Sequence, residues 1–105
     1  MNVQTVLIAV TDMERSKAFY KDVLDMDIEG DFGANVLLKG GVSLQTIESW
    51  PAFIGKNQSD IRLKGYSGEI YFETDDFDGF VEKLSGIQGI RYACPPQEHP
   101  WGQRA

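Results

Sequence analysis

The stretch VTDMERSKAFY, at residues 10–20, marks the point where a strand gives way to a helix. The residues leading into it, Thr5 to Val10, are few and rich in β-branched types, which predicts a strand. Two residues could form the N-cap of this helix. Thr11 has capping-box spacing with Glu14, and Asp12 is the alternative. Apolar residues then recur at helical intervals, so we predict a helix at about 13–24.

Sheet-forming patterns follow this helix. Asp25 to Phe32 predicts a turn and a short strand. Two further strand-like segments, Asn35 to Lys39 and Val42 to Glu48, flank the pair Gly40-Gly41, which suits a two-residue hairpin turn. Ser49 to Ser67 is mixed and polar, and we expect a long loop there.

A second strand-to-helix transition lies further along the chain. Glu69 to Thr74 predicts a strand, and Asp75-Asp76 is placed to cap the helix after it. Gln88 to Tyr92 predicts one more short strand. The apolar stripe of the second helix consists of Phe77, Phe80, Val81 and Leu84.

The two transitions form an internal repeat, because Asp76 follows Asp12 by 64 positions and the same element order surrounds both. This period is too long for a solenoid unit, so two similar β-α-β-β-β modules are expected. The second module is expected to be incomplete, since the counterpart of the hairpin at 35–48 would fall at about 99–112. A single domain over 1–105 then comprises module one at about 3–48, a linker at 49–67 and a truncated module two at about 68–105.

Composition excludes several classes of function. The chain has 105 residues, with 10 Lys+Arg against 16 Asp+Glu and a formal net charge of -6. This balance argues against nucleic acid and against an anionic membrane surface as partners. Cys94 is the only cysteine, and no apolar run approaches the length of a membrane span. The first residues carry no basic signal-peptide pattern, so a cytoplasmic location is expected.

The predicted strands have two different faces. Val6, Ile8 and Val10 share one face with the helix start and should lie beneath the helices. The opposite face is more polar, which is typical either of a solvated sheet surface or of a ligand cup. That face would carry Thr5, Leu7, Ala9, Ser43, Gln45, Ile47, Glu69, Tyr71 and Glu73.

Several stretches resemble the glyoxalase/bleomycin resistance/extradiol dioxygenase superfamily, also called vicinal oxygen chelate. They are Val10 to Tyr20, Val23 to Met26, Glu69 to Phe77 and His99 to Arg104, with Asp25 standing where glycine is usual. The resemblance implies an α+β fold in which two tandem modules form a curved mixed sheet with helices on its outer face. The superfamily includes lyases, isomerases, dioxygenases, thiol transferases and drug-binding proteins, so the fold alone does not select a function.

The resemblance also implies where a metal would be held. The matching positions are Thr5, Gln45 and Glu69, and a fourth would lie past Ala105. A hydroxyl and a neutral amide are weak ligands for a divalent ion, which leaves one good anionic donor. No metal or other cofactor is therefore expected.

Ordinary structural roles are also open to the other reactive or aromatic residues. His99 is expected to be an exposed loop histidine, Cys94 a structural thiol, and the acidic cluster around Asp76 a helix cap. Trp50 and Trp101 either border a pocket or interface, or cover the core.

These observations favour a protein that binds a small organic molecule, cationic or planar, without a catalytic metal. A homodimer is expected from the resemblance, with no nucleic acid and no membrane as partner. The alternative is a metal-dependent lyase or isomerase resembling glyoxalase I, which would need a divalent ion, and a subunit used only for assembly is a third hypothesis. No catalytic residue is assigned, and the predicted ligand-binding residues are Thr5, Gln45, Trp50, Glu69 and Tyr71.

Overall fold

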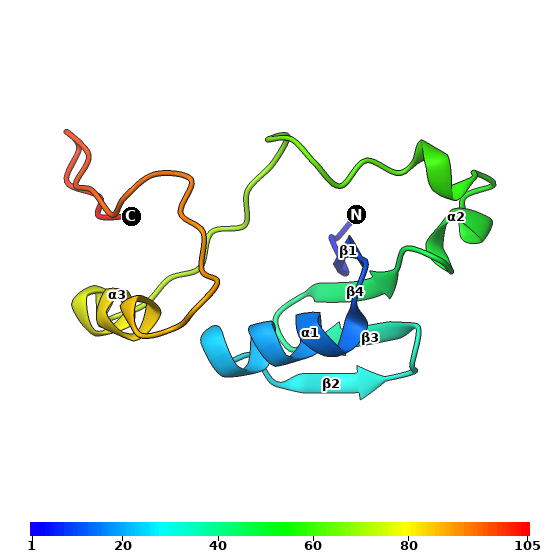
Figure 1. Cartoon of the computed structure of the whole chain (residues 1–105), viewed down its shortest axis with the longest axis horizontal. Coiled ribbons are helices and arrows are strands. Elements are labelled where there is room, and N and C mark those ends of the chain that lie inside the picture. The colour runs from blue at the N-terminus through cyan, green and yellow to red at the C-terminus, as the bar shows by residue number, and fades with distance from the viewer. The chain divides into compact units, whose positions relative to one another are not determined.

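The computed structural model describes all 105 residues and divides into two compact units, Met1–Ser67 and Gly68–Ala105. Figure 1 shows the sheet and the first helix in the N-terminal unit and a single helix in the C-terminal unit. The assignment of the two units as repeated modules stays a prediction.

A four-stranded sheet organises the N-terminal unit. Its spatial order is β1-β4-β3-β2, with β1 parallel to β4 and the other pairs antiparallel. Together with the helix between β1 and β2, this confirms the predicted α+β class and the β-α-β-β-β order of the first half. The strands are β1 (Val6–Val10), β2 (Ile28–Asp31), β3 (Asn35–Leu38) and β4 (Val42–Thr46).

The first helix begins where the sequence predicts. It consists of α1 (Met13–Ala18) followed directly by the π-helical turn η1 (Phe19–Val23). Asp12, not Thr11, is the N-cap, since its carboxylate accepts the Arg15 N–H at 3.1 Å.

Asp25 follows Leu24, the C-cap of this helix, and its φ of 53° lies in the left-handed region. Asp reaches this region more readily than most residues other than glycine, because its short polar side chain can bond locally. The Met26 N–H then donates to the Tyr20 carbonyl at 3.0 Å, which closes the helix and turns the chain toward β2.

The core lies between the sheet and this helix. Val36 and Leu44, on neighbouring strands, are completely buried at its centre. The burial of Val10 in this cluster and the packing of Ile8 against it confirm the prediction for these two residues of β1, whereas Val6 is 51% exposed. The cluster is Val10, Val36, Leu38, Val42 and Leu44, with Ile8, Met13, Tyr20 and Met26 packed against it.

The hairpin between β3 and β4 has a three-residue turn rather than the predicted two. Leu38 pairs with Val42, which leaves Lys39, Gly40 and Gly41 in the connection. Both glycines have positive φ, at 107° and 90°, a conformation that side chains rarely tolerate. The glycine pair therefore permits the turn, as predicted, although the turn is longer.

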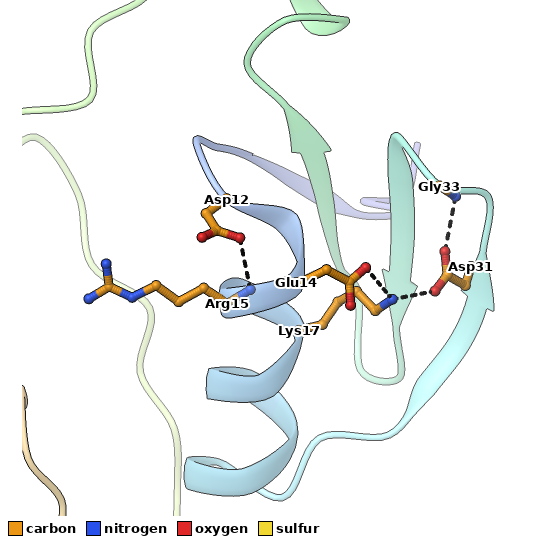
Figure 2. Close-up of polar contacts among 6 residues, drawn as sticks. All are labelled: Asp12, Glu14, Arg15, Lys17, Asp31 and Gly33. Atoms are coloured by element: carbon orange, nitrogen blue, oxygen red, sulfur yellow. Dashed lines mark hydrogen bonds and ion pairs between the residues drawn. The ribbon is translucent and has the colours of Figure 1, made fainter.

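Lys17 joins the helix to the edge of the sheet, as Figure 2 shows. Its ammonium lies 2.7 Å from a carboxylate oxygen of Asp31 and 3.1 Å from one of Glu14. The other Asp31 oxygen accepts the Gly33 N–H at 2.9 Å. The Lys17 hydrogen bond, followed by that of Gly33, lowers the pKa of Asp31 from its ordinary value, and the same ion pair raises the pKa of Lys17.

The segment predicted as one long loop contains two short helices. They are α2 (Trp50–Phe53), which has Pro51 in its first turn, and the 3₁₀ helix η2 (Gln58–Asp60). Asn57 and Asp60 form a reciprocal capping box around η2, a local signal that the loop interpretation missed.

The C-terminal unit is built around α3 (Phe77–Ser85). Asp76 is its N-cap, as predicted, and accepts the Gly79 N–H at 3.0 Å. The strands predicted at Glu69–Thr74 and Gln88–Tyr92 are wrong, because neither segment is hydrogen-bonded into a sheet. A strand needs a partner strand for its backbone groups, whatever its own composition.

The chain ends in a hairpin-like arm at 97–105. Gln97 and Ala105 exchange two backbone hydrogen bonds of 2.8 and 2.9 Å, and Glu98 bridges Arg104 in antiparallel fashion. Arg104 pairs with Asp78 and lies over the Phe77 ring, 4.6 Å from its centroid, so the arm is attached to the start of α3.

His99 lies in the turn of this arm. Its ring stacks on that of Trp101 with the centroids 4.5 Å apart, and His99 is half-buried rather than exposed as predicted.

No helix of the structure is long and apolar enough to span a membrane.

Candidate functional site

The face of the sheet opposite the core carries the polar residues of the predicted site. Strand register aligns Leu7 with Ser43 and Ala9 with Gln45 across the β1–β4 pair. On the other side of β4, Asn35 lies opposite Gln45. Because side chains alternate along strands, these residues point away from the helix-covered face.

Thr5 and Ser43 make the first polar contact on this face. Their hydroxyls lie 3.3 Å apart, with Thr5 exposed and Ser43 only 1% exposed. The contact joins the residue before β1 to the second residue of β4. Thr5 is therefore the solvent-accessible member of this pair.

Gln45 is the centre of the second and larger network. Its side-chain oxygen accepts a hydrogen bond of 2.7 Å from the Asn35 amide, and its own amide donates to the Ser49 hydroxyl at 2.6 Å. Ser49 in turn donates to the Thr46 carbonyl at 3.1 Å. With 6% of its surface exposed, Gln45 is a buried polar residue whose two amide ends both have partners.

Trp50 follows Ser49 directly in the chain and is the first residue of α2. It is half-buried. The predicted site residues Thr5, Gln45 and Trp50 therefore lie in one unit, with the first two on the same face of the sheet.

Glu69 and Tyr71 form a pair in the C-terminal unit. A hydrogen bond from the phenol to the Glu69 carboxylate, reinforced by its charge, raises the pKa of Tyr71. Tyr71 is 75% exposed. The structure thus brings these two predicted residues together, while the grouping of all five residues in one site stays a prediction.

Asn35 and Ser49 are site residues that the sequence interpretation missed. The only available signal for Asn35 was the hairpin register, which places it across from Gln45 once the turn length is known. Ser49 was hidden in the segment expected to be loop. Both residues are polar neighbours of Gln45 that no spacing motif identifies.

The donor atoms on this face do not fit a divalent metal. Thr5 and Gln45 offer neutral oxygens, and the Gln45 oxygen already accepts a hydrogen bond from Asn35. No group of three or more His, Cys, Asp or Glu side chains in the structure is arranged to hold a metal ion. Divalent cations such as zinc require several anionic or imidazole donors, which these residues do not supply.

The sequence model of the Glyoxalase-like domain family matches residues 3–105. The chain belongs to this family. The superfamily resemblance seen in the sequence is therefore confirmed. A search among curated proteins gave no match.

Solved structures share the fold of this glyoxalase-like domain. A protein of unknown function from Agrobacterium tumefaciens str. C58 is 28% identical, with a TM-score of 0.77 over 99% of this chain and 81% of that one. A member of the Glyoxalase/bleomycin resistance protein/dioxygenase superfamily from Sphaerobacter thermophilus is 23% identical, with a TM-score of 0.67, covering 99% of this chain and 84% of its own. A glyoxalase/bleomycin resistance protein/dioxygenase from Nocardioides is 18% identical, with a TM-score of 0.68 and coverage of 99% and 72%.

This glyoxalase-like domain departs from the usual pattern of its superfamily at Asp25, which follows the first helix. Asp25 stands where glycine is usual, and its φ of 53° is one that glycine adopts without steric penalty. Asp is one of the few other residues that tolerate this conformation.

Proposed function

We propose that the chain binds a small organic molecule on the polar face of its sheet, without a catalytic metal. Thr5, Gln45 and Trp50 are the proposed contacts in the N-terminal unit. The observation that carries the proposal is the buried network around Gln45, which holds neutral hydrogen-bonding groups in fixed positions on a face away from the core.

The composition of this face suits an organic ligand. Polar hydroxyl and amide groups lie beside the apolar Leu7 and Ala9, and Trp50 begins the helix that follows Ser49, a partner of Gln45. A few placed polar groups among apolar ones are typical of small-molecule sites. An indole favours planar ligands and, with the net charge of -6, cationic ones. Glu69 and Tyr71 stay predicted contacts.

The two tryptophans allow a direct test. The Trp101→Phe variant leaves Trp50 as the only indole in the chain, and the Trp50→Phe variant leaves Trp101. A panel of neutral and cationic heteroaromatic compounds is titrated into each protein while tryptophan fluorescence is recorded. We expect a saturable change in the Trp50-only protein and none in the matched control. Equal responses in both variants, or none in either, would contradict the proposal.

Chelation separates this proposal from a metal-dependent lyase or isomerase. Treatment with a strong chelator is expected to leave the Trp50 response unchanged, because the donors on this face are neutral and already hydrogen-bonded. A response lost on chelation and restored by a divalent ion would favour the enzyme.

We also propose that the chain forms a homodimer. Strand β1 is an end strand of the sheet, and Val6 on it is 51% exposed. Unpaired strand edges readily pair with another chain. Val6→Lys is expected to shift a dimer toward monomer in sedimentation experiments, whereas Val3→Lys, outside the strand, is the matched control. A wild-type monomer at all concentrations would contradict the dimer.

A further inference from the structure

The hydrogen bonds around Gln45 run in one direction. The Ser49 hydroxyl has one proton, which it can donate to the Thr46 carbonyl at 3.1 Å or to the Thr46 hydroxyl at 2.6 Å. In either case Ser49 accepts a hydrogen bond from the Gln45 amide at 2.6 Å. Gln45 must then turn its oxygen toward Asn35, whose amide donates to it at 2.7 Å.

This relay, formed by Asn35, Gln45, Ser49 and the Thr46 carbonyl, fixes the orientation of two amides. Gln45 is nearly buried, whereas Asn35 is half-buried and forms the outer end of the relay. One N–H of Asn35 is used by Gln45, which leaves its carbonyl oxygen and its second N–H to meet a ligand.

We propose that Asn35 is the residue that recognises the ligand on this face, and that it takes an uncharged amide-like group. An amide offers one donor and one acceptor, which complement the donor and acceptor that Asn35 has left. The relay and its neighbours Thr5 and Ser43 carry no charge, so an ionic group would lose solvation without gaining an opposite charge. Ser49 is a positioning residue that acts through Gln45. This inference rests on the proposed function and deepens it by naming the group of the ligand that Asn35 would bind, whereas a planar or cationic part of the same ligand is expected at Trp50.

Three probes of the same shape test the charge preference. Acetamide, acetate and acetamidinium are neutral, anionic and cationic, and each is titrated into ¹⁵N-labelled wild-type protein. We expect acetamide to produce saturable shifts of the side-chain NH₂ signals of Asn35 and Gln45, and the two ions to produce none. Equal shifts from all three probes, or a response to an ion alone, would overturn the inference.

Substitution at the outer end of the relay tests the residue. Asn35→Asp removes both N–H donors and adds a charge, so we expect acetamide affinity to fall about fivefold and acetamidinium to bind better. Asn2→Asp makes the same chemical change at an exposed terminal position and is expected to leave the titration unchanged. Unchanged acetamide affinity in a folded Asn35→Asp protein would contradict the assignment.

Substitution at the inner end tests the positioning role. Ser49→Ala is expected to weaken acetamide binding and to shift the Gln45 NH₂ signals before any probe is added. Ser49→Thr keeps the hydroxyl and is expected to restore both. If Ser49→Ala lowers the melting temperature alone and leaves the probe titration intact, Ser49 is only structural.

The failure of this inference can be told apart from the failure of the proposed function. If acetamide leaves the Asn35 signals unmoved while a panel compound changes Trp50 fluorescence, the amide preference is wrong and the binding function stands. If acetamide produces no shift and no panel compound changes Trp50 fluorescence, both proposals are wrong.

Discussion

The two units carry the same strand-to-helix pattern and reach different structures. In Met1–Ser67 the pattern yields β1, a capped helix and three further strands around a buried cluster. In Gly68–Ala105 it yields a capped helix and a hairpin-like arm, and none of its residues is fully buried. The helix caps at Asp12 and Asp76 form in both units, whereas the strand forms in only one.

The difference separates local from non-local determinants of structure. A helix bonds within its own segment, and its cap uses a residue three positions away, so both units can build it. A strand needs a partner, and β1 finds β4 only because the Gly40-Gly41 hairpin brings that strand back along the sheet. The apolar residues of the C-terminal unit therefore remain partly exposed.

The largest expected effect comes from comparing matched leucines in the two units. Leu44 is completely buried, and Leu44→Ala should lower the free energy of unfolding by about 2–5 kcal/mol. Leu84 is half-buried on α3, and Leu84→Ala should lower it by about 1 kcal/mol. Urea denaturation of both variants measures the difference. Equal losses would show that the C-terminal unit has a core of its own.

The helix caps test whether local structure is equally important in both units. Asp12→Ala and Asp76→Ala each remove a side-chain cap and should each cost about 1 kcal/mol of helix stability. We expect the first to lower the global unfolding transition and the second to increase hydrogen exchange within α3 alone. Asp75→Ala, one residue before the second cap, is the control. A global effect of Asp76→Ala would mean that the two units unfold together.

Loss of the contacts that attach the C-terminal arm to α3 is expected to have a smaller effect than loss of a helix cap. Arg104→Gln removes both the Asp78 pair and the contact with the Phe77 ring. We expect the arm amides of Gln97 and Ala105 to exchange a few-fold faster, with no change in β4. Arg91→Gln, in the same unit, provides the control. If the hydrogen-exchange protection of these amides is unaffected by the loss of Arg104, the hairpin of the arm is stable without its contacts to α3.

The smallest effect is the pH dependence of the Lys17–Asp31 pair, which joins helix to sheet in the N-terminal unit. The folded chain holds the pKa of Asp31 below its ordinary value of 3.8. The pair therefore stabilises the fold fully above that pH and loses its contribution as pH falls through the lower, folded value. Asp31→Asn should reduce the pH dependence of the free energy of unfolding in this range. Glu29→Gln in the same strand should leave that dependence unchanged. If Asp31→Asn leaves the pH dependence of unfolding unchanged, the Lys17–Asp31 pair contributes no measurable stability.

The sequence predicted those features that depend on nearby residues. The strand β1, the first helix, the Gly40-Gly41 hairpin and the Asp76 cap all have local signals, and the structure contains each. The superfamily was also predictable, because its motifs lie in these same segments.

The features that were missed depend on register or on a distant partner. Asn35 meets Gln45 only because the turn has three residues, which pairs these two positions. The predicted strand at Glu69–Thr74 has suitable composition, but composition supplies no hydrogen-bonding partner. A single sequence does not reveal either fact.

The cap of α3 limits how this helix could be redesigned. In α1 the capped N–H belongs to Arg15, whereas in α3 it belongs to Gly79, where an added Cβ would overlap the Asp76 carboxylate. Replacing a helical glycine with alanine usually gains about 1 kcal/mol, but displacing the cap loses about the same amount. A common thermostabilising substitution would thus gain nothing at this position, and efforts to strengthen α3 should begin beyond its first turn.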